Sequence, residues 1–274
     1  MMVTLAGTLV LVGAGKMGGA MLEGWLAGGA DPARIVALDP APPPETKQLI
    51  GRHGIRLNPD VAAIPDAEVV VIAVKPQLME EVLLSISPLK ASKPLVLTVA
   101  AGKTIASYER HFGADAAVIR TIPNTPAAVG RGITAMASNA NVTPGQLALA
   151  RRLLEAVGEV VTVENEAMID AVTAVSGSGP AYVFYLTECL AAAGEKIGLP
   201  KELAAQLARA TVAGSGELMR QSGTDAAVLR QNVTSPRGTT HEALQVLMAE
   251  DTGMKPLFEK AVAAALRRSR ELAS

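Results

Sequence analysis

The sequence Gly13-Ala14-Gly15-Lys16-Met17-Gly18 fits the pattern Gly-x-Gly-x-x-Gly and lies between an apolar run, Thr8–Val12, and a segment with helical spacing. In this context the first glycine permits a tight turn, the second lets the backbone approach a pyrophosphate, and the third lets helix and strand pack closely. Free N–H groups at the helix start then bind the phosphate charge. We therefore predict a dinucleotide-binding loop; the alternative is a glycine-rich turn that binds no nucleotide.

An acidic residue follows the second predicted strand. Asp39 comes twenty-one residues after Gly18, where a carboxylate accepts hydrogen bonds from an adenosine ribose. A carboxylate there also repels a 2′-phosphate, so Asp39 favours NADH over NADPH, although the cations Arg34 and Lys47 are near in sequence. The alternative is that Asp39-Pro40 only opens a loop as an Asp-Pro turn.

The first half of the chain alternates short β-branched runs with longer helical patterns, which is typical of βαβ units. Several runs, such as Val69–Val74, are continuously apolar, as expected of parallel strands covered by helices on both faces. We predict an α/β fold with a Rossmann-like, doubly wound sheet over residues 1–164. The predicted strands are Thr8–Val12, Arg34–Leu38, Val69–Val74, Leu95–Val99, Val118–Ile122, Ile133–Ala137 and Val160–Val163.

After residue 164 the strand pattern stops, and apolar residues recur at helical spacing. We predict an all-α C-terminal domain over residues 165–274. Its stretch Tyr182–Ala193 has only Thr187 and Glu188 as clearly polar interruptions, so a second copy of the chain is expected to cover it. The predicted helices are Ala167–Val175, Pro180–Ile197, Lys201–Gln221, Asp225–Asn232, Thr240–Ala249 and Met254–Leu272.

Composition excludes several classes of protein. The 274 residues include 25 basic and 26 acidic side chains, and only 3% are aromatic, which does not suit nucleic-acid binding. No window reaches the roughly 18 consecutive apolar residues of a membrane-spanning helix. The single cysteine, Cys189, cannot form an intrachain disulfide, so we expect a reducing compartment, the cytoplasm.

The reactive side chains do not indicate catalysis by the protein alone. His53, His111 and His241 lack the spacing of metal ligands, so no metal site is predicted. Cys189 lies in an apolar helical stretch, where packing is its expected role, and the Gly-x-Ser-x-Gly pattern of a nucleophilic serine does not occur. The chemistry is therefore expected to come from the cofactor, with a small molecule as substrate.

Two polar clusters stand out in the helical half. Ser176-Gly177-Ser178-Gly179-Pro180 lies at a predicted helix start, where hydroxyl and N–H groups can meet an anion or the nicotinamide end of a cofactor. The alternative is a plain turn between helices.

The second cluster is Thr234-Ser235-Pro236-Arg237-Gly238-Thr239-Thr240, which offers four hydroxyl groups before a helix. One interpretation is a capping box of Thr239 and Glu242. That motif leaves Ser235 and Arg237 unexplained, so we predict a site for a small carboxylate.

Together these segments resemble the pyrroline-5-carboxylate reductase family over essentially the whole chain. The motifs Ser176–Tyr182 and Thr234–Pro236 are specific to that family, whereas Ala73–Gln77 is shared widely among Rossmann enzymes. Further matching segments are Ala100–Gly102, Ile122–Pro126 and Asp170–Ala174. The resemblance implies an NAD(P)H-dependent reduction of the cyclic imine 1-pyrroline-5-carboxylate to L-proline, the last step of proline synthesis.

The resemblance also implies site residues and assembly. The helical domains of such enzymes interlock into a homodimer, often assembled further into a decamer. Thr240 would be the catalytic residue, with its hydroxyl near the ring nitrogen, and Asn232 would reach the cofactor from the helical half. The other cofactor-binding residues would be Ala73, Val74, Lys75, Pro76, Val99, Ala100 and Ala101, and the substrate-binding residues Glu166, Ser176, Ser235, Gly238, Thr239 and Thr240.

The inferred mechanism needs little acid–base chemistry. A protonated imine is already electrophilic at carbon, so the enzyme mainly has to hold that carbon at hydride-transfer distance from the nicotinamide. Thr240 would orient the nitrogen or relay a proton, rather than act as a strong acid.

Three residues depart from the family pattern. Arg237 stands where the family usually has a small residue, and Asp39 replaces the small or basic residues of members that prefer NADPH. Asp60 stands where a cofactor-side Asn is expected.

Two other functions fit parts of the sequence. A β-hydroxyacid dehydrogenase would need a catalytic Lys after the Gly-rich start of its interdomain helix, and Pro180–Leu190 contains none. A nucleotide-sensing or scaffold protein would keep the fold without turnover. Substrate-dependent oxidation of reduced cofactor distinguishes the sensor from a reductase.

Overall fold

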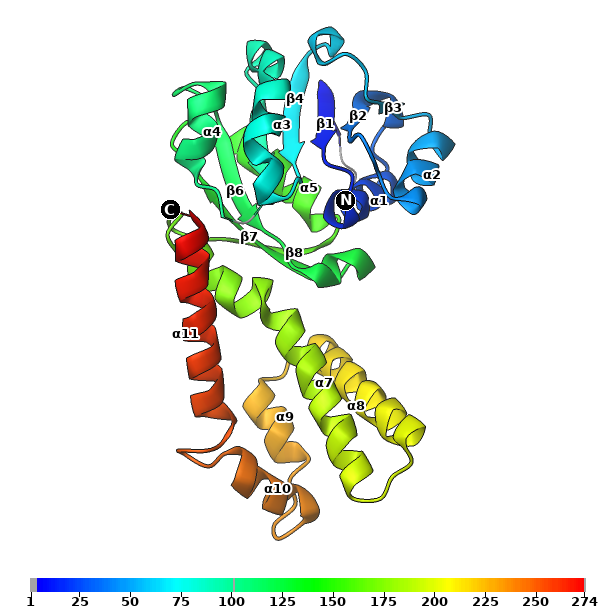
Figure 1. Ribbon diagram of the computed structural model, residues 1–274, viewed down its shortest axis with the longest axis vertical. Coiled ribbons are helices and arrows are strands. Elements are labelled where there is room, and N and C mark those ends of the chain that lie inside the picture. The colour runs from blue at the N-terminus through cyan, green and yellow to red at the C-terminus, as the bar shows by residue number, and fades with distance from the viewer. Residues whose placement is uncertain (1–3, 101, 274) are drawn as a thin grey trace. The chain divides into compact units, whose positions relative to one another are not determined.

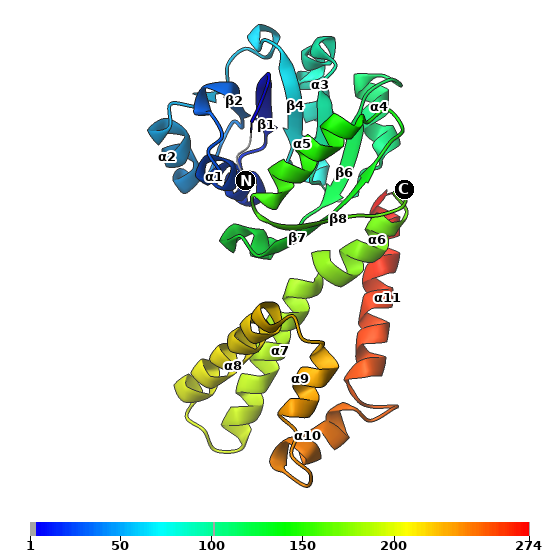
Figure 2. The ribbon, with the colours of Figure 1, turned by 180° about the vertical axis from the view of Figure 1, so that it is seen from behind.

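The computed structural model of the protein describes residues 4–100 and 102–273. The chain forms two compact units: Met1–Gly177 together with Leu266–Ser274, and Ser178–Ala265. Within the described residues, the first unit contains the sheet and the second is helical (Figures 1 and 2). The domain boundary expected after residue 164 stays a prediction.

An eight-stranded sheet of order β3-β2-β1-β4-β5-β6-β7-β8 forms the centre of the first unit. The first six strands of this order run parallel, β7 is antiparallel to β6, and β8 is parallel to β7. The strand order reverses between β1 and β4, as in doubly wound folds. The bounds are β1 Thr8–Val12, β2 Ile35–Leu38, β3 Arg56–Leu57, β4 Ala67–Ile72, β5 Leu95–Thr98, β6 Val118–Ile122, β7 Gly132–Ser138 and β8 Gly158–Thr162.

The predicted Rossmann-like sheet is confirmed, with two differences. All seven predicted strands are present, and Thr8–Val12 and Val118–Ile122 have the predicted bounds. The short strand β3 was not predicted, because the pair Arg56–Leu57 has no apolar run or alternation. The last two strands do not continue the parallel order; β7 follows β6 in sequence and pairs with it in the opposite direction.

Helices cover both faces of the sheet because its central strands are buried on both sides. Val69 and Val71 of β4 belong to the core under α1 and α5, whereas Val70 and Ile72 belong to the core under α3 and α4. Figure 1 shows α3 and α4 on one face, and Figure 2 shows α5 on the other. The helices of this unit are α1 Lys16–Ala27, α2 Pro44–Arg52, α3 Met79–Ser85, α4 Ile105–Phe112, α5 Pro144–Glu155 and α6 Met168–Val172.

A buried indole joins two of these helices. Trp25 of α1 is fully buried, and its Nε1 donates to the carbonyl oxygen of Leu153 at 2.8 Å. At the end of α5 the N–H of Val157 donates to Leu154 instead of Leu153. The indole therefore satisfies a carbonyl that the end of the helix leaves without its usual partner.

The second unit contains α7 Gly179–Lys196, α8 Lys201–Ser222, α9 Ala226–Asn232, α10 Thr239–Leu247 and the first part of α11, Met254–Ala273. Tyr182 of α7 meets Phe258 of α11 edge to face, with ring centroids 6.1 Å apart. None of the described residues of α7 is buried in the single chain, and Phe184 and Tyr185 are more than half exposed. This is the uncovered apolar surface that the sequence predicts.

The predicted helices are present, with one change before α7. The helix expected over Ala167–Val175 ends at Val172 and continues as a π-helical turn, Thr173–Gly177, which leads to α7. Among the described residues, none of the helices is long and apolar enough to cross a membrane.

Candidate functional site

A cleft of about 680 Å³ lies at the carboxyl ends of β1 and β4, where the strand order reverses. In open α/β sheets this is the place where ligands bind. We call it the switch-point cleft. Its lining includes Gly13, Gly15, Asp39, Ala73, Val74 and Lys75, all of which the sequence predicts to bind the cofactor.

The glycine loop has the shape that its three glycines predict. Gly13 has φ +90°, a left-handed conformation, and a Cβ there would lie 2.7 Å from the carbonyl oxygen of Ala73. A Cβ on Gly18 would overlap the carbonyl oxygen of Gly13. Side chains at these two positions are therefore excluded by the packing of the loop against β4 and α1.

Gly15 differs from the other two because it faces open space. A Cβ added there would meet nothing within 4 Å. Gly15 is also the N-cap of α1, and no side chain caps this helix. Helix α1 thus begins at a residue that lines the cleft, and no side chain caps its first N–H groups, which is the arrangement that holds a pyrophosphate.

The remaining loop residues have other surroundings. Ala14 is buried, and Met17 packs partly against the core. Lys16 lines a separate surface groove with Glu23 and Glu45.

Asp39 connects β2 to the glycine loop. Its Oδ2 accepts from the N–H of Ala14 at 2.7 Å, and its Oδ1 accepts from the N–H of Ala41 at 2.8 Å. The second bond forms the Asp-Pro turn considered from the sequence. Asp39 therefore shapes the turn and lines the cleft at the same time, so the two interpretations do not exclude each other.

Asn58 is a cleft residue that the sequence analysis missed. Its side chain accepts from the N–H of Asp39 and donates to the carbonyl of Asp39, both at 2.8 Å. It follows the unpredicted strand β3, and an Asn-Pro pair after a strand was the available signal. Asp60 is not part of the cleft lining; its carboxylate accepts from the N–H of Ala62 at 3.0 Å.

The segments after β4 and β5 have different surroundings. Ala73, Val74 and Lys75 line the cleft, whereas Pro76 begins a short 3₁₀ helix and does not. Val99 and Ala100 are buried at the end of β5. Ala101 lies outside the described residues.

Buried hydroxyl groups support the backbone after β5. Thr98 Oγ1 lies 2.7 Å from the hydroxyl of Tyr108 and 3.3 Å from the N–H of Ala100, which donates to it. Burial raises the pKa of Tyr108 to about 12. The hydroxyl therefore stays neutral at physiological pH and serves as a hydrogen-bonding support.

Glu166 and Ser176, predicted to bind substrate, lie near the end of the first unit. Glu166 Oε1 accepts from the N–H of Ile105 at 2.8 Å and from Arg120 Nη1 at 3.0 Å. Ser176 Oγ donates to the carbonyl of Val172. Ser176 belongs to the π-helical turn, and α7 begins at Gly179, so the cluster links these two helical segments. Such turns are frequent at functional sites.

The other predicted substrate residues lie in the second unit, as does Asn232, which is predicted to reach the cofactor. Asn232 ends α9, and the turn from Ser235 to Gly238 is closed by a 3.0 Å bond between the N–H of Gly238 and the carbonyl of Ser235. Helix α10 begins at Thr239, so Thr239 and Thr240 lie in its first turn.

The capping box of Thr239 and Glu242 is not formed. Gly238 is the N-cap of α10, and no side chain caps the helix. The box would require Thr239 as the N-cap, but Thr239 is already the first helical residue. The hydroxyls of Thr239 and Thr240 therefore do not cap α10.

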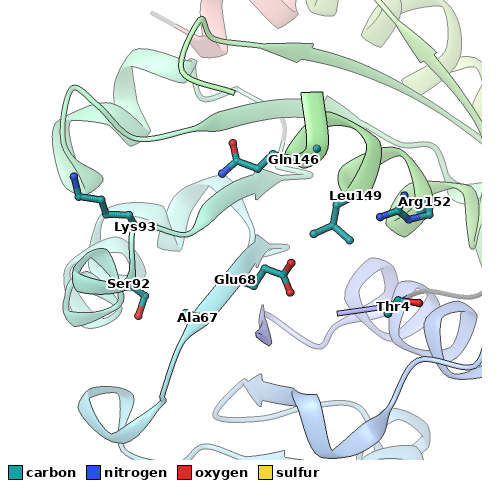
Figure 3. A pocket seen from close by; sticks show the side chains of 9 residues that line it. Thr4, Ala67, Glu68, Ser92, Lys93, Gln146, Leu149 and Arg152 are labelled. Atoms are coloured by element: carbon teal, nitrogen blue, oxygen red, sulfur yellow. The ribbon is translucent and has the colours of Figure 1, made fainter. Parts of the chain in front are cut away.

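A second cavity, of about 410 Å³, lies at the opposite edge of the sheet, where β4 and β5 begin (Figure 3). Three of its polar side chains already have partners. Glu68 accepts from the N–H groups of Ala6 and Gly7, Lys93 pairs with Asp115, and Gln146 belongs to a capping box. The switch-point cleft is therefore the better candidate for a dinucleotide site.

Comparison with known families gives two matches. A family model described as pyrroline-5-carboxylate reductase dimerisation matches residues 166–272. A model described as NADP oxidoreductase, coenzyme F420-dependent, matches residues 8–102.

Individual relatives agree with these matches. A pyrroline-5-carboxylate reductase from Pseudomonas aeruginosa is 40% identical over 97% of this chain and 96% of its own, and one from Synechocystis is 45% identical over 80% and 81%. The solved structure of a pyrroline-5-carboxylate reductase from Coxiella burnetii has a TM-score of 0.90 at 34% identity, covering 98% of this chain and 100% of its own. That of a Plasmodium falciparum pyrroline carboxylate reductase with NADP bound has a TM-score of 0.81 at 28% identity, covering 98% and 99%.

Two glycine variants test the loop. Gly15→Ala should fold like the wild type but bind NADH and NADPH at least about tenfold more weakly, because its methyl group enters the space open to a pyrophosphate. Gly18→Ala should lose roughly 2–3 kcal/mol of stability through overpacking. Thermal unfolding and fluorescence titration with each cofactor measure both effects. Wild-type affinity in Gly15→Ala would contradict the assignment.

Proposed function

The chain belongs to the pyrroline-5-carboxylate reductase family, and on this premise we propose that it reduces 1-pyrroline-5-carboxylate to L-proline with NADH or NADPH. The observation that carries the proposal is the match to a reductase that spans 97% of this chain and therefore both of its units. The open glycine loop and the switch-point cleft support it, since such a reaction needs a dinucleotide site.

The residues of the first unit would hold the cofactor. The first N–H groups of α1 would bind the pyrophosphate, Asp39 would bind the adenosine ribose, and Asn58 would hold Asp39 in place. The backbone segments Ala73–Pro76 and Val99–Ala101 would continue the site toward the nicotinamide. Bound NADH or NADPH supplies a hydride.

The residues of the second unit would bind the substrate. Ser235, Gly238 and Thr239 would hold its carboxylate with hydroxyl and N–H groups at the start of α10, which no side chain caps. Thr240 would orient the ring nitrogen or relay a proton, and Asn232 would reach toward the cofactor. Because the protonated imine is already electrophilic, positioning accounts for most of the required catalysis.

Glu166 and Ser176 are the proposed substrate residues of the first unit. Glu166 is tied to Arg120 and to the start of α4 through Oε1, and its side chain remains 29% exposed. We propose that the exposed part of this carboxylate faces the cationic imine. Ser176 would contribute from the π-helical turn.

Asp39 is the basis for proposing NADH as the preferred cofactor. Its carboxylate already accepts two N–H groups of the surrounding loop, which keeps the negative charge in the cleft. A 2′-phosphate beside this charge would be repelled. The relative from Plasmodium falciparum, 28% identical, has NADP bound; the charge of Asp39 supports NADH for this chain.

The assembly that we propose is a homodimer through the helical unit, with decamers built from such dimers. The location that we propose is the cytoplasm. Residues 166–272 match a dimerisation model, and the exposed side chains of Phe184, Tyr185 and Leu190 on α7 supply an apolar surface for a second copy.

The proposed activity is tested by cofactor oxidation. We expect purified protein to consume NADH, followed at its absorbance maximum, only when 1-pyrroline-5-carboxylate is present, and to form L-proline in equal amount. Intact cofactor binding without substrate-dependent oxidation would favour a nucleotide-sensing or scaffold protein instead.

Thr240→Ala tests the catalytic hydroxyl. Loss of one hydrogen bond to a charged group corresponds to about 1.5–3 kcal/mol, so kcat should fall about 10- to 100-fold while cofactor affinity persists. Thr240→Ser keeps the hydroxyl and should retain most activity. Near-normal turnover of Thr240→Ala would remove Thr240 from the mechanism.

Asp39→Ser tests the cofactor preference, with Asp39→Asn as the variant that removes the charge but keeps the shape. Both should raise kcat/KM for NADPH relative to NADH by about tenfold, equivalent to about 1.4 kcal/mol of removed repulsion. Steady-state kinetics with each cofactor measure the ratio. An unchanged ratio in Asp39→Asn would reject the argument.

A further inference from the structure

One face of β6 contacts the segment that leads out of the first unit. We call residues 165–177 the connecting segment, because the second unit begins at Ser178. Alternate residues of an extended chain point to the same side, and here they are Arg120, Ile122 and Asn124. Arg120 binds Glu166, Ile122 shares a core cluster with Ile169, and Asn124 Nδ2 donates to the carbonyl of Ser176. The connecting segment is thus held along its whole length.

Arg120 provides the charged contact in this row. Its side chain is only 3% exposed, its Nη1 lies 3.0 Å from Glu166 Oε1, and its Nη2 lies 3.6 Å from Asp170 Oδ1. Its Nε is buried without a hydrogen-bond partner among the described residues. The two carboxylates therefore determine how the guanidinium is oriented. Removing such a buried charge leaves its partners uncompensated.

The second connection between the units attaches to the same cluster. The chain returns to the first unit at Leu266, within α11. One turn further along this helix, Ser269 Oγ donates to Asp170 Oδ1 at 2.8 Å. Asp170 therefore contacts both Arg120 and the returning helix. Both places where the chain passes between the units are linked to one buried arginine.

The cluster also reaches the helix that follows β5. Glu166 Oε1, which binds Arg120, accepts from the N–H of Ile105 at the start of α4. Helix α4 comes shortly after Val99–Ala101, the segment proposed to line the cofactor site. Arg120 itself does not line the switch-point cleft.

We propose that Arg120 is a positioning residue for the reduction. Through Glu166 and Asp170 it anchors both chain segments that connect the first unit to the unit with Ser235–Thr240. This anchoring restricts the motion of Ser235–Thr240 and thereby raises kcat. The inference rests on the proposed function. It assigns Arg120 an effect on turnover, without a contact to cofactor or substrate.

Arg120→Lys tests the proposal, because lysine keeps the positive charge but lacks the planar fork that binds two carboxylates. We expect kcat to fall about tenfold, with the dissociation constant of NADH within about twofold of wild type. Amide hydrogen exchange in α6 and in the last turns of α11 should accelerate at least about tenfold, while β1 and β4 stay protected.

Arg151→Lys is the matched control. Arg151 is an arginine of the same unit that binds the carbonyl of Val160 and the hydroxyl of Thr162, which precede the connecting segment. Its replacement should change neither kcat nor exchange in α6 and α11. Equal losses of kcat in the two lysine variants would overturn the proposal.

Ser269→Ala is a milder variant that removes only the contact of α11 with Asp170. It should accelerate exchange at the end of α11 but not in α6, and lower kcat about two- to fivefold.

Unchanged exchange in Arg120→Lys, or faster exchange with unchanged kcat, would overturn the proposed role. Wild-type protein that does not reduce 1-pyrroline-5-carboxylate would overturn the proposed function. In that case hydrogen exchange of Arg120→Lys would still show whether Arg120 anchors the two connections.

Discussion

The structure depends on the burial of β1 and β4 on both faces. Val69 and Val71 pack into one core, and Val70 and Ile72 pack into the other, so helices must cover both sides of the sheet. Where the strand order reverses, the chain segments that leave neighbouring strands go to opposite faces and leave a crevice between them. The switch-point cleft and the tight glycine loop at its edge both follow from this arrangement of buried strands.

Features with a local cause could be predicted from the sequence. A continuous apolar run indicates a strand buried on both faces. The glycine spacing predicts where the backbone turns tightly, where it leaves room for a ligand and where it packs closely against a helix. All three glycines have the expected surroundings. The strand β3 and Asn58 could not be predicted in this way. Two residues show no periodicity, and the bonds between Asn58 and Asp39 become visible only after β2 and β3 are paired.

The missed part of the site consists of contacts between residues distant in sequence. The resemblance implied a substrate contact for Glu166, but no pattern in the sequence indicates that Arg120, 46 residues earlier, binds the same carboxylate. Arg120 is the single charged residue of β6, and its burial was not predicted. A charged residue in such a strand is itself informative, since it must find partners of opposite charge when the sheet forms.

Arg237 shows how a departure from a family pattern is accommodated. Its φ of +56° is a left-handed conformation that favours glycine, which gives a physical reason for a small residue there. An arginine in this conformation costs roughly 1–2 kcal/mol. The turn is nevertheless closed by the bond from the N–H of Gly238 to the carbonyl of Ser235, which involves no side chain of Arg237. This backbone bond therefore closes the proposed substrate turn independently of the side chain at position 237.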